Sequence, residues 1–365
     1  MSAQTPSATF TNSPSSDAAL DELCQHLRST AAELDCSGQW PAAQMQWCAQ
    51  AGVFRWFIPP EFGGWGWSEQ QILAGYLKLS KCCLTTTFVL TQWQAACRRI
   101  VASDNTELKQ QLLPLMAQGG LMVTVGISHL TTSRQHVGRP VLAANLQADG
   151  SLTLEGYSPW VTAAPAADVI VVGATLQDGR QVLCALPKTR SGVKAGPGQP
   201  LVALTASCTD EVLLHGVHIK PAEILAGPIE NVMSSGAGGG TGGLQTSTLA
   251  IGLSLAAVDF LTAQAEHRSE LVAVAAKLRG DCEHLRQVLS DLTDGGASMS
   301  AGELRQRANS LALRSTQAAL SAAKGAGFVA THVTGRMARE ALFFLVWSCP
   351  QPVVAASLCE LAQLS

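Results

Sequence analysis

The chain has 365 residues, 47% of them hydrophobic, and a formal net charge of −3 with no long basic run. This length predicts two or three domains, and the charge excludes the basic surface that nucleic-acid binding requires. No uninterrupted apolar stretch of about 18 residues occurs, so no membrane span is expected.

The first segment, residues 1–16, is rich in Ser, Thr and Pro and contains no basic region followed by an apolar one. We expect a disordered leader here, because such a composition buries too little apolar surface to fold.

Residues 17–120 follow a helical pattern and are predicted to form an N-terminal helical domain. Leu20, Leu27, Ala31 and Leu34 fall roughly on one face of the first helix. The Pro- and Gly-rich stretch at residues 57–66 is too irregular for a helix or a strand. Further helices are expected at residues 45–51, 69–79, 84–101 and 107–116.

Residues 121–228 change to strand patterns and are predicted to form a β-domain. The turn pairs Asp149–Gly150 and Asp178–Gly179 separate some of the strands. Short strands at this spacing are typical of a small antiparallel sandwich or barrel. The expected strands are residues 122–127, 141–146, 151–155, 168–172, 181–186 and 211–214.

Residues 229–243 read as a Gly-rich linker, and residues 244–365 as a C-terminal helical bundle. Long Ala- and Leu-rich helical patterns with short connections predict a four-helix bundle. The fold class expected is therefore α+β and multidomain. A Rossmann domain is not expected, because no βαβ alternation and no GxGxxG after a strand occur. The expected bundle helices are residues 244–265, 271–292, 301–325 and 330–345.

Eleven cysteines are scattered at irregular spacing without a CxxC pair. An odd number in such an arrangement predicts reduced thiols in a cytoplasmic protein and no structural zinc. No metal site is expected.

The segment Gly156–Thr162 carries the first functional signal. It offers Trp160, Val161 and Thr162: an aromatic face, a short backbone stretch and a hydroxyl. A flat redox-active ring needs a surface to stack on and a hydrogen bond at its edge. The alternative is a buried tryptophan in a β-turn.

Several motifs in order resemble the acyl-CoA dehydrogenase family of flavoproteins, over roughly residues 20–350. They are the loop Pro60–Gly66, the segment Gly156–Thr162, the strand end Leu214–Pro221 and the turn Lys324–Phe328. The resemblance implies bound FAD, with Trp160 covering the ring and Thr162 bonding near its reactive nitrogen. Ser128 keeps a hydroxyl at the family's flavin-contacting strand, where His129 replaces an acidic residue.

The same resemblance extends to the bundle. It places Arg268 on the arginine that contacts the FAD pyrophosphate across a subunit interface, although Leu271–Val272 replaces the Phe–Gly that should follow. Gly325 and Gly327 stand in a turn whose glycines let backbone N–H groups approach a phosphate. A homo-dimer or homo-tetramer is therefore expected.

The family's catalytic base is missing at its usual place. That glutamate sits nine residues after an Arg-Asp-Ala triplet, and nine residues past Arg339 in Arg339–Ala341 lies Ser348. A neutral serine cannot remove an α-proton at neutral pH without an activating partner. Displaced bases are conceivable at Glu340, Glu360 or Asp210.

Three functions therefore stay open. The first is a flavin-dependent dehydrogenase acting on the CH–CH group of an acyl-CoA or related thioester, with an electron-transfer flavoprotein as acceptor. The second is a flavin-dependent monooxygenase served by a flavin reductase, which needs no such base. The third is a non-catalytic relative that binds FAD or CoA.

Overall fold

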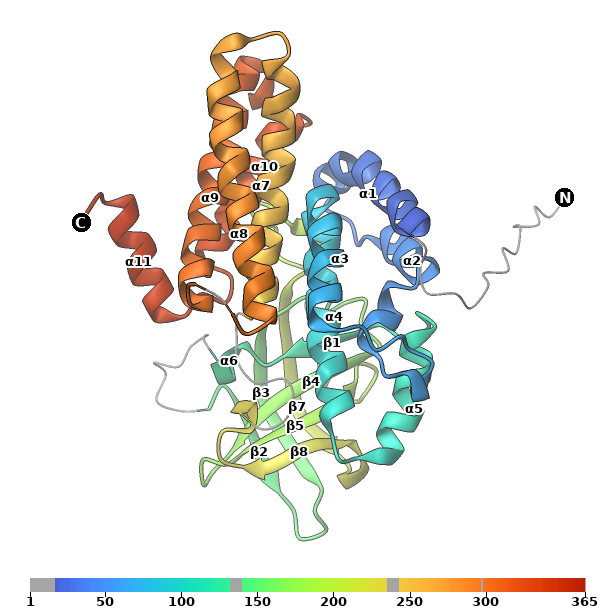
Figure 1. Ribbon diagram of the computed structural model, residues 1–365. Helices are drawn as coiled ribbons and strands as arrows, with labels where there is room; N and C mark the ends of the chain where they lie inside the picture. Colours follow the sequence, from blue (N-terminus) through green and yellow to red (C-terminus); the bar gives the residue numbers. More distant parts are fainter. Residues whose placement is uncertain (1–16, 132–139, 235–242, 297, 365) are drawn as a thin grey trace, which may run out of the picture.

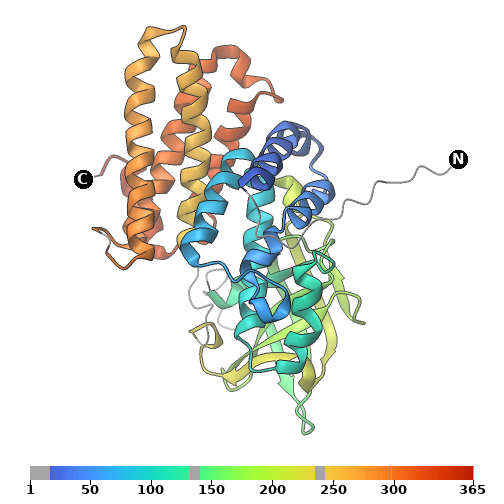
Figure 2. The ribbon, with the colours of Figure 1, turned by 45° about the vertical axis from the view of Figure 1, so that its right-hand side comes forward.

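The computed structural model describes residues 17–131, 140–234, 243–296 and 298–364. Three parts follow one another along the chain: helices, a sheet and a second group of helices (Figures 1 and 2). The expected leader and most of the Gly-rich linker lie outside the described residues.

Five helices make up the N-terminal part: α1 (Asp17–Ser37), α2 (Ala42–Gln50), α3 (Glu69–Cys82), α4 (Leu84–Ala102) and α5 (Thr106–Ala117). The predicted apolar face of α1 is confirmed, because its members are all buried. A capping box between Ser68 and Gln71 starts α3, and the Asn105 side chain caps α5. Between α2 and α3 lies the Pro/Gly loop, in which short 3₁₀ turns replace regular structure.

Eight strands form one sheet: β1 (Val123–Gly126), β2 (Leu142–Leu146), β3 (Leu152–Val161), β4 (Val169–Leu176), β5 (Gln181–Pro187), β6 (Val193–Ala195), β7 (Asp210–Ile219) and β8 (Ile224–Ile229). Their order is β6-β7-β3-β2-β4-β5-β8, with β1 beside β4. We expected an antiparallel sheet, and this is wrong in part. The sheet is mixed, because β1 and β2 both pair parallel to β4. The pattern of apolar residues indicates which face of a strand is buried, but it does not indicate the direction of the neighbouring strand. The prediction also missed β6 and β8.

Strand β4 joins two hydrophobic cores. Val169 and Val171 belong to the large core shared with the helices, whereas Ile170 and Val172 belong to the core inside the sheet. Both faces of this strand are therefore buried, which explains its run of consecutive apolar residues.

The C-terminal part contains α7 (Leu244–Ala265), α8 (Val272–Thr293), α9 (Ala301–Ala323), α10 (Val333–Leu342) and α11 (Gln351–Leu361). The fourth expected helix is shorter than predicted and α11 was not predicted, since the chain turns sharply between Phe343 and Pro350. By length and composition α7 could cross a membrane, but 72% of its apolar window is buried inside the protein.

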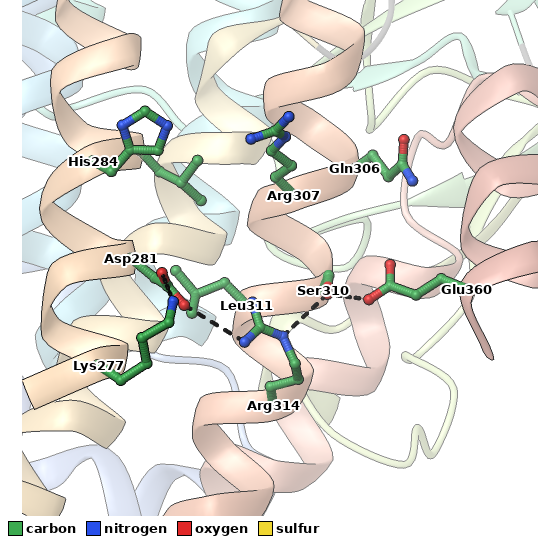
Figure 3. A pocket seen from close by; sticks show the side chains of 10 residues that line it. Lys277, Asp281, His284, Gln306, Arg307, Ser310, Leu311, Arg314 and Glu360 are labelled. Carbon is green, nitrogen blue, oxygen red and sulfur yellow. Dashed lines mark hydrogen bonds and ion pairs between the residues drawn. The ribbon is translucent and has the colours of Figure 1, made fainter. Parts of the chain in front are cut away.

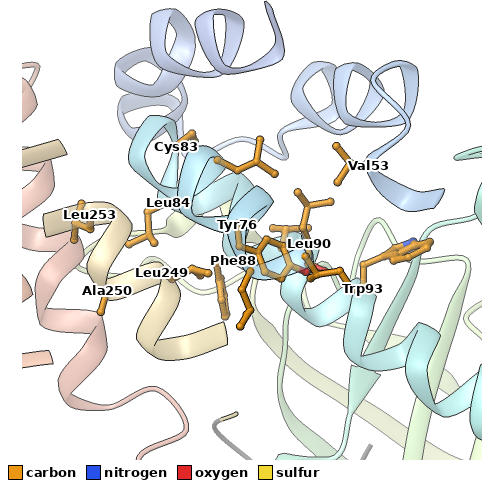
Figure 4. Close-up of a cluster of buried hydrophobic side chains, with 14 of the residues drawn as sticks. Val53, Tyr76, Cys83, Leu84, Phe88, Leu90, Trp93, Leu249, Ala250 and Leu253 are labelled. Carbon is orange, nitrogen blue, oxygen red and sulfur yellow. The ribbon is translucent and has the colours of Figure 1, made fainter. Parts of the chain in front are cut away.

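Helix α7 packs against α3 and α4 and so connects the bundle to the N-terminal helices. Leu249 and Leu253 lie beside Leu84 and Phe88 in this contact (Figure 4). Gly252 lies so close to α3 that an added Cβ would stand 1.9 Å from the Ser80 hydroxyl oxygen. The glycine therefore sets how closely the two helices approach.

Candidate functional site

Trp160 is the last residue but one of strand β3 and lies on the surface. Strand β3 extends past residue 155, where we expected it to end, and Trp160 has a φ of 56° there. Its side chain is 57% exposed, so the alternative of a buried tryptophan in a turn is wrong. A large aromatic side chain held outward by left-handed backbone offers a flat face to a ligand.

Val161 and Thr162 are buried directly behind Trp160. The Thr162 hydroxyl is 2.9 Å from the Thr209 hydroxyl, which in turn is 2.8 Å from the hydroxyl of Ser207. This chain of hydroxyls points into the protein. The Thr162 side chain, which we expected to bond the edge of a ring, therefore bonds within the protein. Trp160 is the exposed side chain of this segment.

Ser128 lies beside this segment, in the short helix α6 (Ser128–Thr131) that follows β1. Its hydroxyl donates a hydrogen bond of 2.8 Å to the carbonyl oxygen of Pro159, the residue before Trp160. The structure therefore brings Ser128 and Trp160 together as expected.

His129, next to Ser128, points the other way. It is buried, and its Nε2 lies 2.7 Å from the carbonyl oxygen of Gly173. Burial lowers its pKa, so the ring stays neutral. These contacts give His129 a structural role.

The loop that carries Ser348 is held by aromatic packing. Phe343 and Trp347 are stacked with ring centroids 5.1 Å apart, and Phe88 of α4 meets both rings edge-on. Ser348 itself has a φ of 45°, a conformation that is uncommon for a residue with a side chain. The surrounding structure must fix this conformation for it to persist.

Arg305 of α9 supplies part of that constraint, and the sequence analysis missed it. Its Nη2 donates a hydrogen bond of 2.7 Å to the carbonyl oxygen of Trp347, and its guanidinium lies 5.8 Å from the centre of the Trp347 ring. The side chain is only 2% exposed, and its Nε and Nη1 have no partner among the described residues. Burial lowers its pKa. The sequence did contain a signal for this role: Arg305 falls on the apolar face of its helix, together with Leu304, Ala308 and Leu311.

The three displaced bases considered above are all engaged with other partners. Asp210 accepts hydrogen bonds from the Gln199 side chain and from the backbone of Gly198 and Glu211, which lower its pKa despite burial. Glu340 is buried 3.6 Å from the Arg336 guanidinium, in a cavity between the two groups of helices. Burial raises its pKa to about 7.

Glu360, the third, lies in a polar cavity between α8, α9 and α11 (Figure 3). Its carboxylate accepts a hydrogen bond from Ser310, while Asp281 pairs with Lys277 and Arg314. Both carboxylates therefore have a partner inside this cavity. The residues outside the described ranges include no Asp or Glu, so every carboxylate side chain is placed.

The predicted phosphate-binding residues gather at another place, the end of the bundle remote from the sheet (Figure 1). Arg268 donates a hydrogen bond of 2.6 Å to the carbonyl oxygen of Ala322, just before the turn with Gly325 and Gly327. The neighbouring Phe328 is 88% exposed. These residues do not share a site with Trp160 within one copy of the chain.

Comparison with known proteins identifies the N-terminal domain and the fold. Residues 16–120 match the acyl-CoA dehydrogenase N-terminal domain. The fold superposes on butyryl-CoA dehydrogenase from Megasphaera elsdenii with a TM-score of 0.80 and 16% identity, covering 97% of this chain and 100% of the other. Residues 16–120 therefore form an acyl-CoA dehydrogenase N-terminal domain, and the whole chain has the acyl-CoA dehydrogenase fold.

Monooxygenases are also among the proteins that this chain resembles. Dibenzothiophene monooxygenase from Rhodococcus qingshengii is 23% identical over 213 residues, which cover 56% of this chain and 50% of that protein. The chain thus spans about half the length of that curated relative. TdsC from Paenibacillus sp. A11-2, solved with FMN and indole, superposes with a TM-score of 0.76 and 16% identity, covering 95% of this chain and 96% of the other.

Proposed function

We propose that this chain is a flavin-dependent monooxygenase with the acyl-CoA dehydrogenase fold. One observation carries the proposal. Ser348 stands where the resemblance places the base, and the three carboxylates that might replace it are engaged elsewhere. Oxidation of an acyl thioester at its CH–CH group needs a base within reach of the α-proton, whereas oxygenation does not.

The residues around Trp160 fit a flavin ring. The exposed indole provides a stacking face, and Ser128 provides a hydroxyl next to it. A bound flavin supplies a hydride acceptor when oxidised and, when reduced, the electrons for reaction with molecular oxygen. The chain's own part is to hold that ring and to shield the reacting centre from water.

Aromatic side chains around Ser348 favour an apolar substrate. Phe88, Phe343 and Trp347 surround this loop, and Arg305 fixes it through the Trp347 carbonyl. The Ser348 hydroxyl can donate or accept a hydrogen bond but does not hold a negative charge at neutral pH. It is therefore suited to orienting a substrate and not to deprotonating it.

We further propose FAD as the form of the flavin and a homo-dimer or homo-tetramer as the active assembly. Arg268 and the glycine turn lie far from Trp160 in one chain, so they would serve the pyrophosphate of a neighbouring copy. The exposed Phe328 beside that turn supports a subunit contact. A flavin reductase is then the expected partner, and the cytoplasm the expected location.

The second candidate is acyl-CoA dehydrogenation, favoured by the family-model match over residues 16–120. The two functions differ in what reacts with the purified protein. After its absorption spectrum is recorded, the protein is mixed with straight-chain acyl-CoAs without oxygen. In a second arm it receives reduced flavin, oxygen and a panel of aromatic substrates.

A monooxygenase leaves the flavin absorbance unchanged in the first arm and incorporates labelled oxygen into product in the second. Rapid bleaching by an acyl-CoA would refute the proposal in favour of the dehydrogenase. A colourless protein that takes up no flavin would refute both and support the non-catalytic relative.

A further inference from the structure

A pair of cysteines lies at a cavity that the proposed flavin chemistry does not use. The cavity has a volume of about 170 Å³ and is lined by side chains of α1, α3, α7 and α10 and of the α3–α4 junction. Cys82, at the end of α3, lines it together with Arg28 of α1. Cys24 lies one turn before Arg28 on the same helix, so its thiol is on the face of α1 from which Arg28 contacts Cys82.

From this geometry we propose that Cys82 and Cys24 form a peroxide-reactive thiol pair. The Arg28 Nη2 donates a hydrogen bond of 3.4 Å to the Cys82 sulfur. A guanidinium in that position stabilises the thiolate, which is the nucleophilic form of cysteine. The second thiol, Cys24 of α1, can then attack the oxidised Cys82 and form a disulfide with it.

The surroundings separate this pair from the other cysteines. Hydrogen bonding from Cys24, assisted by Arg28 and Lys81, lowers the pKa of the Cys82 thiol to about 7, and the same bond raises that of Cys24. By contrast, burial raises the pKa of the Cys48 thiol and, in spite of Arg98, that of the Cys97 thiol. Cys82 is thus the thiol expected to ionise at neutral pH.

The reaction needs a hydroperoxide as oxidant. The Cys82 thiolate attacks the distal oxygen, the O–O bond breaks, and an alkoxide or hydroxide leaves, so that Cys82 becomes a sulfenic acid. The Cys24 thiol then attacks the Cys82 sulfur, forms the S–S bond and releases water. Each disulfide formed therefore reduces one hydroperoxide and links α1 to α3.

The test uses the full-length protein treated with hydrogen peroxide and digested without reduction. Trypsin cleaves after Arg28, Lys81 and Arg98, so Cys24 and Cys82 fall in separate peptides, and fragment spectra distinguish Cys82 from Cys83. We expect the Cys24–Cys82 linked peptide to appear before oxidation of the exposed Cys36 and Cys359. Absence of that linked peptide, or slower formation than oxidation at Cys36, would overturn the proposal.

Two variants test the parts. Cys24→Ser should leave a sulfenic acid at Cys82 that dimedone traps. Arg28→Met keeps an unbranched apolar stem but removes the guanidinium and its charge, and it should slow oxidation of Cys82 about tenfold by lowering the thiolate fraction. An unchanged rate in a folded Arg28→Met protein would show that the cation plays no part. Should that variant fail to fold, the wild-type peptide map still decides the matter.

Discussion

Glu340, one of the three carboxylates considered as the base, allows a sharp test of whether a buried carboxyl keeps its proton in this protein. The carboxyl is 3% exposed, and burial raises its pKa from 4.5 to about 7 in spite of the nearby Arg336. The folded protein therefore holds its proton up to higher pH than the unfolded chain does. It follows that the stability contributed by this group is fully present below pH 4.5 and is lost as the pH rises through 7.

The size of the effect follows from the two pKa values. A gap from 4.5 to about 7 corresponds to about 3 kcal/mol in total, of which about 2.5 kcal/mol falls between pH 5 and pH 8. Glu340→Gln keeps the shape of a protonated glutamate but cannot ionise. The variant should consequently gain about 2.5 kcal/mol relative to wild type on going from pH 5 to pH 8.

Urea unfolding of both proteins at the two pH values measures this difference. Glu22→Gln on the exposed face of α1 is the matched control and should show almost no change with pH. If the gap between wild type and Glu340→Gln stays constant within about 1 kcal/mol, Glu340 is ionised in the folded state. The Arg336 pair would then outweigh burial, and the reasoning that Glu340 keeps its proton in the folded protein would fail.

Three further predictions concern the site and its scaffold. Trp160→Ala should weaken flavin binding by about 1–3 kcal/mol, measured by titration of apoprotein, whereas Trp160→Phe should keep most of the affinity; equal affinities in all three proteins would remove Trp160 from the site. Ser348→Glu should raise the rate of anaerobic bleaching by an acyl-CoA about 10²–10⁴-fold if position 348 faces the substrate, and no change in stopped-flow absorbance would place it elsewhere. Gly252→Ala should lower the free energy of unfolding by about 1–3 kcal/mol, because the new Cβ meets the Ser80 hydroxyl, and adding Ser80→Gly should recover part of this loss; a double variant no more stable than the single one would contradict that account.

The sequence by itself determined the order of the architecture. A helical period, then strand patterns, then Ala- and Leu-rich helices predict the three parts because periodicity decides which face of each element is apolar. The α1 face formed by Leu20, Leu27, Ala31 and Leu34 is an example, and its burial confirms the prediction. The sequence also predicted local turns. The pair Asp149–Gly150, for example, forms a turn between β2 and β3.

Only the tertiary structure decided which side chains meet. Nothing local reveals that Trp160 faces outward or that Thr162 bonds to Thr209, because strand direction and neighbours set both. The burial of Arg305 beneath the Ser348 loop also depends on a contact between α9 and a distant turn. Charge placement and pKa depend on burial and partners brought together by folding, and these belong to the packed chain as a whole.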